Sequence, residues 1–204
     1  MKRLFDLAGA LAGLLLLSPL LVAIAVWIRL DSPGPAWFRQ ERVGRHGRPF
    51  RIHKFRTMRI EGDAVSAPRA ASSLPLTVGE DPRITRAGAW LRRTKLDELP
   101  QLIDVVVGDM SLVGPRPEVP RYVALYPPEL KAKVLSVRPG ITDPSSIEYR
   151  EESALLARAA DPEREYIEVV MPAKLRAAAR YVDGMSLGTD LRVIGATLRA
   201  LWLH

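Results

Sequence analysis

The chain has 204 residues, enough for one domain with its own hydrophobic core, or for one domain with an appendage. It contains no cysteine, so a disulfide framework and a thiolate metal site are both excluded. The histidines, His46, His53 and His204, have no metal-ligand spacing, which leaves hard cations with oxygen ligands. A net charge of +7 predicts an anionic partner: nucleic acid, a lipid headgroup surface or a phosphorylated small molecule.

An uncharged apolar segment covers residues 7–28. As a helix it would be about 33 Å long, enough to cross a bilayer. A cleaved signal peptide is disfavoured, because its apolar core is usually only about 7–15 residues long. A plain membrane-spanning helix is also disfavoured. Lys2 and Arg3 precede the segment and a series of arginines follows it, so both flanks favour the cytoplasmic side.

Ser18 and Pro19 lie near the middle of this apolar segment. Proline removes a backbone donor and clashes with the carbonyl group of Leu15, and Ser18 can satisfy a backbone group freed in this way. A break there leaves two arms of about 15–16 Å, each half the thickness of the hydrocarbon layer. The residues alone leave two arrangements equally open, a re-entrant helix-break-helix hairpin over residues 1–33 and a Pro-kinked spanning helix.

The rest of the chain, residues 34–204, predicts a mainly helical α+β globular domain on the cytosolic side. Turn residues end the membrane segment, and apolar alternation around a glycine-containing loop then predicts a small β-hairpin. Small, polar and Pro-punctuated residues at about 61–79 predict a mobile surface loop. A helix is predicted to begin at Thr85 or Arg86, and a later helical pattern ends at Gly108.

Residues 186–204 predict an amphipathic C-terminal helix. A stripe at helical spacing is more often core than membrane contact, although Trp202 and the basic residues also suit an interfacial helix. The stripe consists of Leu191, Ile194, Leu198 and Leu201.

Two adjacent carboxylates, Asp97 and Glu98, stand in the stretch RTKLDELPQL between a basic cluster and Pro100. The structural interpretation is a helix start. Thr94 and Asp97 have the spacing of a capping box, and Asp97 can itself cap a helix with Pro100 in its first turn. The functional interpretation is a reacting centre. Taken alone, the stretch favours the structural interpretation.

Arginines on proline-stiffened loops change this balance. Arg116 lies between two prolines and Arg138 precedes another, and the planar guanidinium suits phosphate. An ionised aspartate can attack phosphorus without a general base. Two like charges about 4 Å apart repel by about 4 kcal/mol at an effective dielectric of 20, so Mg²⁺ and arginines must offset the charge. Singly, each of these features also fits an ordinary turn or a solvated helix.

Several motifs occur in a specific order: SP in the apolar segment, then FRQERVG, KFRTM, DPRITRAGAWLRRTKLDELPQL, GDMSLVGPRP and RPGIT. Together they resemble the small monotopic phosphoglycosyl transferases, which begin bacterial glycoconjugate assembly. The resemblance runs from about Lys2 to Asp190. It implies a Mg²⁺-dependent enzyme of the bacterial inner membrane, with its catalytic domain on the cytoplasmic face. The substrates would be a nucleotide sugar, usually a UDP-sugar, and polyprenol (undecaprenyl) phosphate, with membrane lipids as partners and no nucleic acid.

The resemblance also implies roles for individual residues. Asp97 would be the nucleophile that takes up the phosphosugar and releases UMP, and Glu98 would help to hold Mg²⁺. The helix break at Ser18 and Pro19 matches the re-entrant helix of the family. The phosphate-binding set comprises Lys54, Arg56, Arg92, Arg116 and Arg138. Asp190 matches a further family position of less defined role.

Two departures from the family pattern affect these expectations. After RPGIT the chain reads DPSSI over residues 143–147, where many members have glycine followed by an Ala-Gln or Trp-Gln pair. The family's assignments for base or sugar recognition therefore do not carry over to this segment. Asp104 stands where asparagine is common. The non-enzymatic alternative, a basic membrane-anchored module that binds anionic lipid or nucleic acid, explains the charge but leaves the carboxylate pair unexplained.

Overall fold

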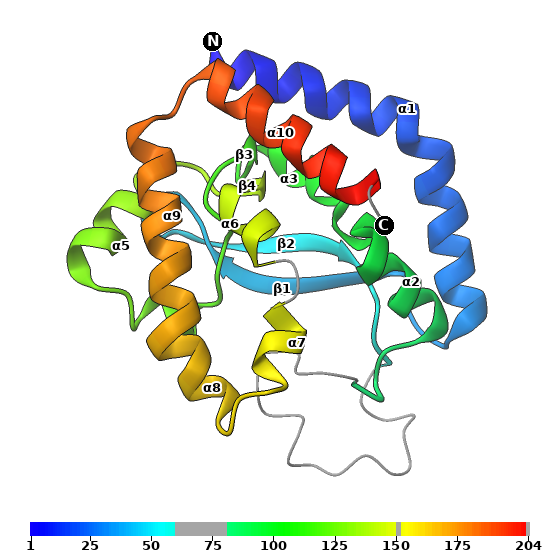
Figure 1. The fold of residues 1–204 in the computed structure, drawn as a ribbon. Coiled ribbons are helices and arrows are strands. Elements are labelled where there is room, and N and C mark those ends of the chain that lie inside the picture. Colours follow the sequence, from blue (N-terminus) through cyan, green and yellow to red (C-terminus); the bar gives the residue numbers. More distant parts are fainter. Residues whose placement is uncertain (60–80, 150–151, 203–204) are drawn as a thin grey trace.

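The computed structural model describes residues 1–59, 81–149 and 152–202 (Figure 1). These residues form a mainly helical α+β structure, which confirms the α+β part of the predicted fold class. A long amino-terminal helix, α1 (Lys2–Asp31), arches over the other elements. The loop predicted at 61–79 lies outside the described residues.

Helix α1 is continuous and bent, where the sequence analysis predicted two arms separated by a break. It contains Pro19 and changes direction about its middle (Figure 1). Pro19 has no N–H for the carbonyl oxygen of Leu15, one turn earlier. The Ser18 hydroxyl donates to that same oxygen over 2.9 Å. Because this backbone group is satisfied, the helix passes through the proline as a kink.

One side of α1 packs on the domain through small residues. Ala10 is fully buried, and a Cβ at Gly9 would lie 2.7 Å from Leu112 Cδ1. The other side is apolar and exposed, and α1 is the one helix in the described ranges long and apolar enough to cross a membrane. Its exposed apolar residues include Leu11, Leu15, Leu16, Val22, Val26 and Leu30.

The predicted β-hairpin is confirmed. Strands β1 (Trp37–Val43) and β2 (Pro49–Phe55) pair antiparallel, joined by a 3₁₀ turn, η1 (Arg45–Gly47). Buried side chains of β2 pack under α1 and α3, in the pattern of a sheet with one covered face.

The middle of the chain brings short elements together under α1. Helix α2 (Arg86–Thr94) is capped by the Thr85 hydroxyl, which accepts from Gly88 N. A 3₁₀ turn, η3 (Leu96–Glu98), leads to α3 (Gln101–Val107), which ends at Gly108 with φ 106°. Both boundary predictions, near residue 85 and at Gly108, are thereby confirmed.

A second, parallel strand pair was not predicted: β3 (Ser111–Val113) with β4 (Gly140–Thr142). The backbone of Gly114, just after β3, lies directly against that of Gly140, the first residue of β4, since a Cβ on Gly140 would lie 2.0 Å from Gly114 N. One arginine-containing loop follows β3 and the other precedes β4, and backbone contacts bring them together: a Cβ on Gly114 would lie 2.5 Å from the carbonyl oxygen of Arg138, and Gly140 N donates to the carbonyl oxygen of Pro115 over 2.9 Å.

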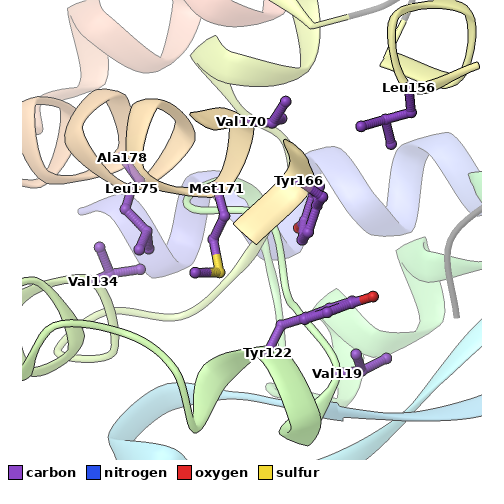
Figure 2. Packing of buried hydrophobic residues seen from close by; sticks show 9 residues of the cluster. All are labelled: Val119, Tyr122, Val134, Leu156, Tyr166, Val170, Met171, Leu175 and Ala178. Carbon is purple, nitrogen blue, oxygen red and sulfur yellow. The ribbon is translucent and has the colours of Figure 1, made fainter. Parts of the chain in front are cut away.

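The second half of the chain has its own core, made by short helices packed on a long one. The rings of Tyr122 and Tyr166 pack against each other at its centre, tilted by 54° with their centroids 4.9 Å apart (Figure 2). The elements are α4 (Pro120–Val123), α5 (Pro128–Val134), α6 (Pro144–Glu148), α7 (Glu152–Leu156), α8 (Pro162–Glu165), the π-helical η4 (Tyr166–Val170) and α9 (Met171–Asp183).

The amphipathic C-terminal helix is confirmed as α10 (Leu187–Trp202). The prediction that its stripe is core is wrong for two of its members: Leu191 is 54% exposed and Leu198 is 53% exposed. Ile194 packs against Val193 and Tyr181. Ile194 lies at the edge of the face of α10 that meets the domain, since the buried residues of this helix are Asp190 and Val193 among those whose side chains are described.

Candidate active site

The carboxylate pair lies in the turn η3, between two helices. Lys95 ends α2 in a left-handed conformation, with φ 59°, and Asp97 and Glu98 follow at once. The Thr94 hydroxyl donates to the carbonyl oxygen of Trp90 one turn earlier, so it belongs to the last turn of α2 and does not cap the next helix. Helix α3 starts after Pro100 without a side-chain cap. The predicted capping roles of Thr94 and Asp97 are therefore wrong, and both buried carboxylates are available for other contacts.

Glu98 is held by two cations. Arg116 donates to both of its oxygens, Nη2 to Oε1 over 2.7 Å and Nη1 to Oε2 over 3.2 Å. Lys54 Nζ lies 3.1 Å from Oε1. Burial by itself raises the pKa of Glu98, but the charges of Arg116 and Lys54 outweigh burial and hold the pKa well below its ordinary value of 4.5. The charge of Glu98 in turn raises the pKa of Arg116, so the ion pair between these two residues stays charged at neutral pH.

The two oxygens of Asp97 differ in their hydrogen bonding within the described residues. Lys54 Nζ bridges the dyad, 3.1 Å from Asp97 Oδ2 and 3.1 Å from Glu98 Oε1. Asp97 Oδ1 is buried and has no hydrogen-bond partner among the described residues. A buried oxygen without a partner is costly in a folded protein and often marks a functional position. The arrangement leaves Oδ1 available to react, while Lys54 orients the carboxylate.

The structure brings two of the five predicted phosphate-binding residues to the dyad, Lys54 and Arg116. Arg56 is buried elsewhere: it donates to the carbonyl oxygen of Ser32 over 2.8 Å and to that of Pro33, at the end of α1. Arg138 Nε donates to the carbonyl oxygen of Gly108 over 2.7 Å.

Arg92 lies on α2 two residues before the end of that helix, and no hydrogen bond joins it to the dyad in the part of the chain that the structure describes. Of the five predicted phosphate-binding residues, therefore, only Lys54 and Arg116 contact the carboxylates in the described part of the structure.

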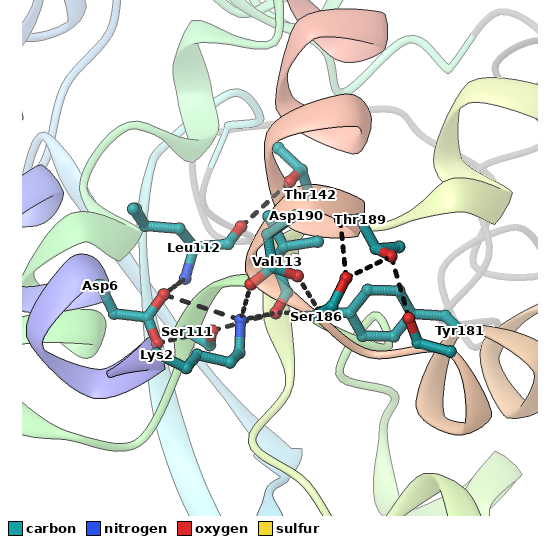
Figure 3. A network of polar contacts seen from close by, with 11 residues as sticks. Lys2, Asp6, Ser111, Leu112, Val113, Thr142, Tyr181, Ser186, Thr189 and Asp190 are labelled. Atoms are coloured by element: carbon teal, nitrogen blue, oxygen red, sulfur yellow. Dashed lines mark hydrogen bonds and ion pairs between the residues drawn. The ribbon is translucent and has the colours of Figure 1, made fainter.

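Asp190 lies in a separate buried network (Figure 3). Lys2 Nζ lies 2.5 Å from Asp190 Oδ2 and donates to the carbonyl oxygen of Val113 over 3.1 Å. The Tyr181 hydroxyl donates to Asp190 Oδ1 over 2.6 Å. Asp190 does not cap α10, since the Ser186 hydroxyl accepts from Thr189 N at the start of that helix over 3.1 Å. Asp190 instead joins the amino terminus of α1 to α10.

One contact near the dyad was missed. Asp104, on the helix that follows the carboxylates, accepts from His53 N over 2.9 Å, and its Oδ1 lies 2.6 Å from His53 Nδ1. His53 neighbours Lys54 on β2, so this contact ties the strand that carries the lysine to α3. Burial raises the pKa of Asp104. An aspartate where asparagine is common was the one sequence feature that could have drawn attention to Asp104. A single sequence does not show that this aspartate contacts His53.

A second missed set surrounds the turn that carries Arg116. Glu118 accepts from Arg42 Nη1 over 3.0 Å and from the Tyr166 hydroxyl over 2.6 Å. These three residues lie on elements far apart in the sequence, and no local pattern joins them.

Comparison with known proteins identifies the family. A model of the family described as bacterial sugar transferase matches residues 1–204. A UDP-glucose:undecaprenyl-phosphate glucose-1-phosphate transferase of Caulobacter vibrioides is 37% identical over 203 residues, 98% of this chain and 69% of that one. An uncharacterized sugar transferase of Bacillus subtilis, EpsL, is 35% identical over 199 residues, 98% of this chain and 86% of that one.

A UDP-N-acetylgalactosamine-undecaprenyl-phosphate N-acetylgalactosaminephosphotransferase of Aeromonas hydrophila is 36% identical over 202 residues, 98% of this chain. The chain spans less than two thirds of the length of several curated relatives that it matches, and 43% of the Aeromonas protein. With the family model matching along its length, the chain belongs to the bacterial sugar transferase family.

Proposed function

We propose that this protein is a phosphoglycosyl transferase, which moves a sugar 1-phosphate from a UDP-sugar to undecaprenyl phosphate. The observation that carries the proposal is the four-residue site, in which Lys54 and Arg116 surround the Asp97–Glu98 pair and Asp97 Oδ1 has no described partner. The activities for which the Caulobacter and Aeromonas relatives are named support this reaction class. The alternative, a basic binding module without enzymatic activity, gains no support from the relatives.

In the proposed first step, Asp97 Oδ1 attacks the β-phosphorus of the UDP-sugar. A bond forms between that oxygen and phosphorus, the bond from the β-phosphorus to the bridging oxygen breaks, and UMP leaves with the electron pair. In the second step, an oxygen of undecaprenyl phosphate attacks the same phosphorus. The bond to Asp97 then breaks, which restores the carboxylate and gives undecaprenyl-diphosphate sugar. Lys54 and Arg116 stabilise the charge that develops on the phosphoryl oxygens.

The donor set of the site fits Mg²⁺ brought in with the substrate. Among the residues described, no group of three or more His, Asp or Glu side chains forms a complete protein cage for a metal. Mg²⁺ often takes only one or two carboxylates and fills its shell with water and substrate phosphates. Glu98, beside the buried oxygen of Asp97, would hold the ion, which would neutralise diphosphate charge.

Metal binding can be measured apart from turnover. Mn²⁺, titrated by electron paramagnetic resonance, should bind more tightly when UDP is present, and Glu98→Gln should weaken this ternary binding. Equal Mn²⁺ affinity in Glu98→Gln would contradict the role of Glu98.

The proposed membrane arrangement is a re-entrant α1 on the cytoplasmic face of the inner membrane. Support comes from the contacts at its two ends, since Lys2 and Arg56 join opposite ends of the helix to one domain. A helix that crossed the bilayer would place those ends on opposite sides.

The chain has no cysteine, so introduced cysteines report topology directly. In inverted membrane vesicles, a cysteine inserted after Met1 and one at Pro35→Cys should both react with an impermeant maleimide, and Leu16→Cys should not. Reaction at only one of the two ends would establish a spanning helix.

The decisive experiment on the reaction uses purified protein with UDP-sugars and undecaprenyl phosphate, with released UMP as the readout. Wild type should release UMP and form lipid-linked product, whereas Asp97→Asn should form neither. Normal turnover by Asp97→Asn would show that Asp97 is not the nucleophile. Release of UDP in place of UMP would show cleavage at the anomeric carbon, the reaction of a glycosyl transferase.

A further inference from the structure

The position of Arg116 is set by a turn. Its guanidinium donates to both oxygens of Glu98, yet the side chain is 35% exposed and long. Such a side chain loses about 2 kcal/mol of conformational freedom when it is held in one place. A partly solvated arginine therefore stays in a two-bond geometry best when its backbone does not move.

The backbone of this turn is held at three carbonyl groups. The carbonyl oxygen of Pro115 accepts from Gly140 N over 2.9 Å, that of Pro117 from Arg42 Nη1 over 3.2 Å, and that of Glu118 from Val43 N over 2.9 Å. The two prolines have no N–H and a restricted φ, so little freedom is left between these contacts.

The carboxylate of Glu118 connects the turn to two distant elements. Its Oε1 accepts from Arg42 Nη1 on β1 over 3.0 Å, and its Oε2 accepts from the Tyr166 hydroxyl on η4 over 2.6 Å. Tyr166 is almost fully buried and lies against Tyr122 in the second core (Figure 2). Its π-helical segment is a form of helix that is frequent at functional sites.

Burial shifts the pKa of the arginine and of the tyrosine in this set. Burial lowers the pKa of Arg42, and the charge of Glu118 opposes that shift. Burial and then the neighbouring Glu118 raise the pKa of Tyr166, so its hydroxyl keeps the proton that it donates.

We propose that Arg42, Glu118 and Tyr166 are positioning residues for the transfer reaction, acting through Arg116. They fix the Pro115–Glu118 turn so that the guanidinium meets Glu98 in its two-bond geometry. This inference rests on the proposed function, and it assigns these three residues no contact with substrate. A misplacement of about 1 Å at a reacting centre can cost a factor of about 100 in rate, so a small relaxation of the turn is enough to be measured.

A double-mutant cycle tests the proposal, with the single-turnover rate of UMP release from a UDP-sugar as the readout. Glu118→Ala should slow release by a factor of about 10 to 100, while UDP binding changes by less than about threefold. In the Arg116→Ala background, Glu118→Ala should add less than about threefold, because the residue through which it acts is gone. If Glu118→Ala brings its full loss in that background as well, the proposal is overturned.

Matched variants separate positioning from folding. Glu168→Ala removes an exposed carboxylate paired with Arg164 and should leave the rate unchanged. Tyr166→Phe deletes only the hydroxyl that donates to Glu118. Its loss of rate should be smaller than that of Glu118→Ala and should likewise disappear in the Arg116→Ala background. If Glu118→Ala fails to fold, Tyr166→Phe takes its place in the cycle. A rate for Tyr166→Phe equal to that of wild type would remove Tyr166 from the set.

The failure of the proposed function is recognised separately. Wild type that releases no UMP from any UDP-sugar would overturn the function. The positioning role is then decided by thermal unfolding, which measures the coupling energy between Arg116→Ala and Glu98→Ala. This coupling energy should be smaller when Glu118 is also replaced by alanine than when Glu118 is present. An unchanged coupling would overturn the positioning role.

Discussion

At the scale of single residues, Glu98 links the site to the stability of the fold. Its folded-state pKa lies well below the ordinary 4.5, so its contacts stabilise the protein fully above about pH 4.5. That stabilisation is lost as the pH falls through the lowered folded-state value, because the unfolded chain takes up the proton first.

Glu98→Gln should therefore lose less stability than wild type when the pH is lowered from about 6 to about 3. Thermal unfolding across this range measures the difference, and the exposed Glu168→Gln serves as control. Parallel pH profiles for Glu98→Gln and wild type would contradict the assigned pKa shift.

Asp104 is a second residue whose contribution can be measured. It is buried and accepts from both the backbone N–H and the ring of His53. Asp104→Ala leaves these donors without an acceptor and should lower the free energy of unfolding by about 1–3 kcal/mol. Asp104→Asn keeps one acceptor oxygen and should cost less. Chemical denaturation in detergent measures both, and equal losses in the two variants would show that the hydrogen bonds to His53 contribute nothing.

At the scale of elements, α10 presents apolar surface that the domain does not cover. Leu191 and Leu198 are each about half exposed on a helix that also carries Arg192 and Arg199, the composition of an interfacial helix. We expect this face to lie at the membrane surface beside α1.

Spin labels at Leu191→Cys and Leu198→Cys, in protein reconstituted into nanodiscs, should be more accessible to oxygen than to a water-soluble nickel complex. A label at the exposed Arg164→Cys should show the opposite preference. Accessibility of the two leucine positions equal to that of Arg164→Cys would mean that this face of α10 is in water.

Elements were predicted well wherever a local signal defines them. The cap at Thr85, the stop at Gly108 and the hairpin around η1 follow from neighbouring residues, and all three are observed. The bend at Pro19 was predicted as a break, because the effect of the Ser18 hydroxyl on the Leu15 carbonyl depends on a rotamer. The apolar periodicity of α10 predicts a stripe, but it does not show which side of that helix the domain covers. For this reason Leu191 and Leu198 were wrongly assigned to the core.

In the candidate site, too, residues with a local signal were predicted and contacts set by distant segments were not. The dyad and Arg116 stood out as residue types in unusual surroundings, and the structure places them together. Arg56 has the same appearance in the sequence, yet it holds carbonyl oxygens at the end of α1. Whether an arginine faces a carboxylate or a helix end is decided by packing between distant segments, which a motif does not encode.

At the scale of the whole molecule, Lys2 and Asp190 connect α1 to α10. Lys2→Ala leaves the fully buried Asp190 without its cation and should destabilise the protein by about 3–5 kcal/mol. The double variant Lys2→Ala/Asp190→Asn removes the charge as well and should be more stable than Lys2→Ala alone. Thermal unfolding of the three proteins measures this order, and a double variant less stable than the single one would contradict it.

The same pair has a consequence for biogenesis. Its two residues are 188 positions apart, so a ribosome making about 5–20 residues per second delivers Asp190 roughly 10–40 s after Lys2. During that interval the apolar α1 has left the ribosome while its amino-terminal lysine has no carboxylate to meet on α10. Helix α1 is therefore made well before α10 and is joined to it at this end last, and a chain stalled before α10 would carry α1 attached only through its earlier contacts.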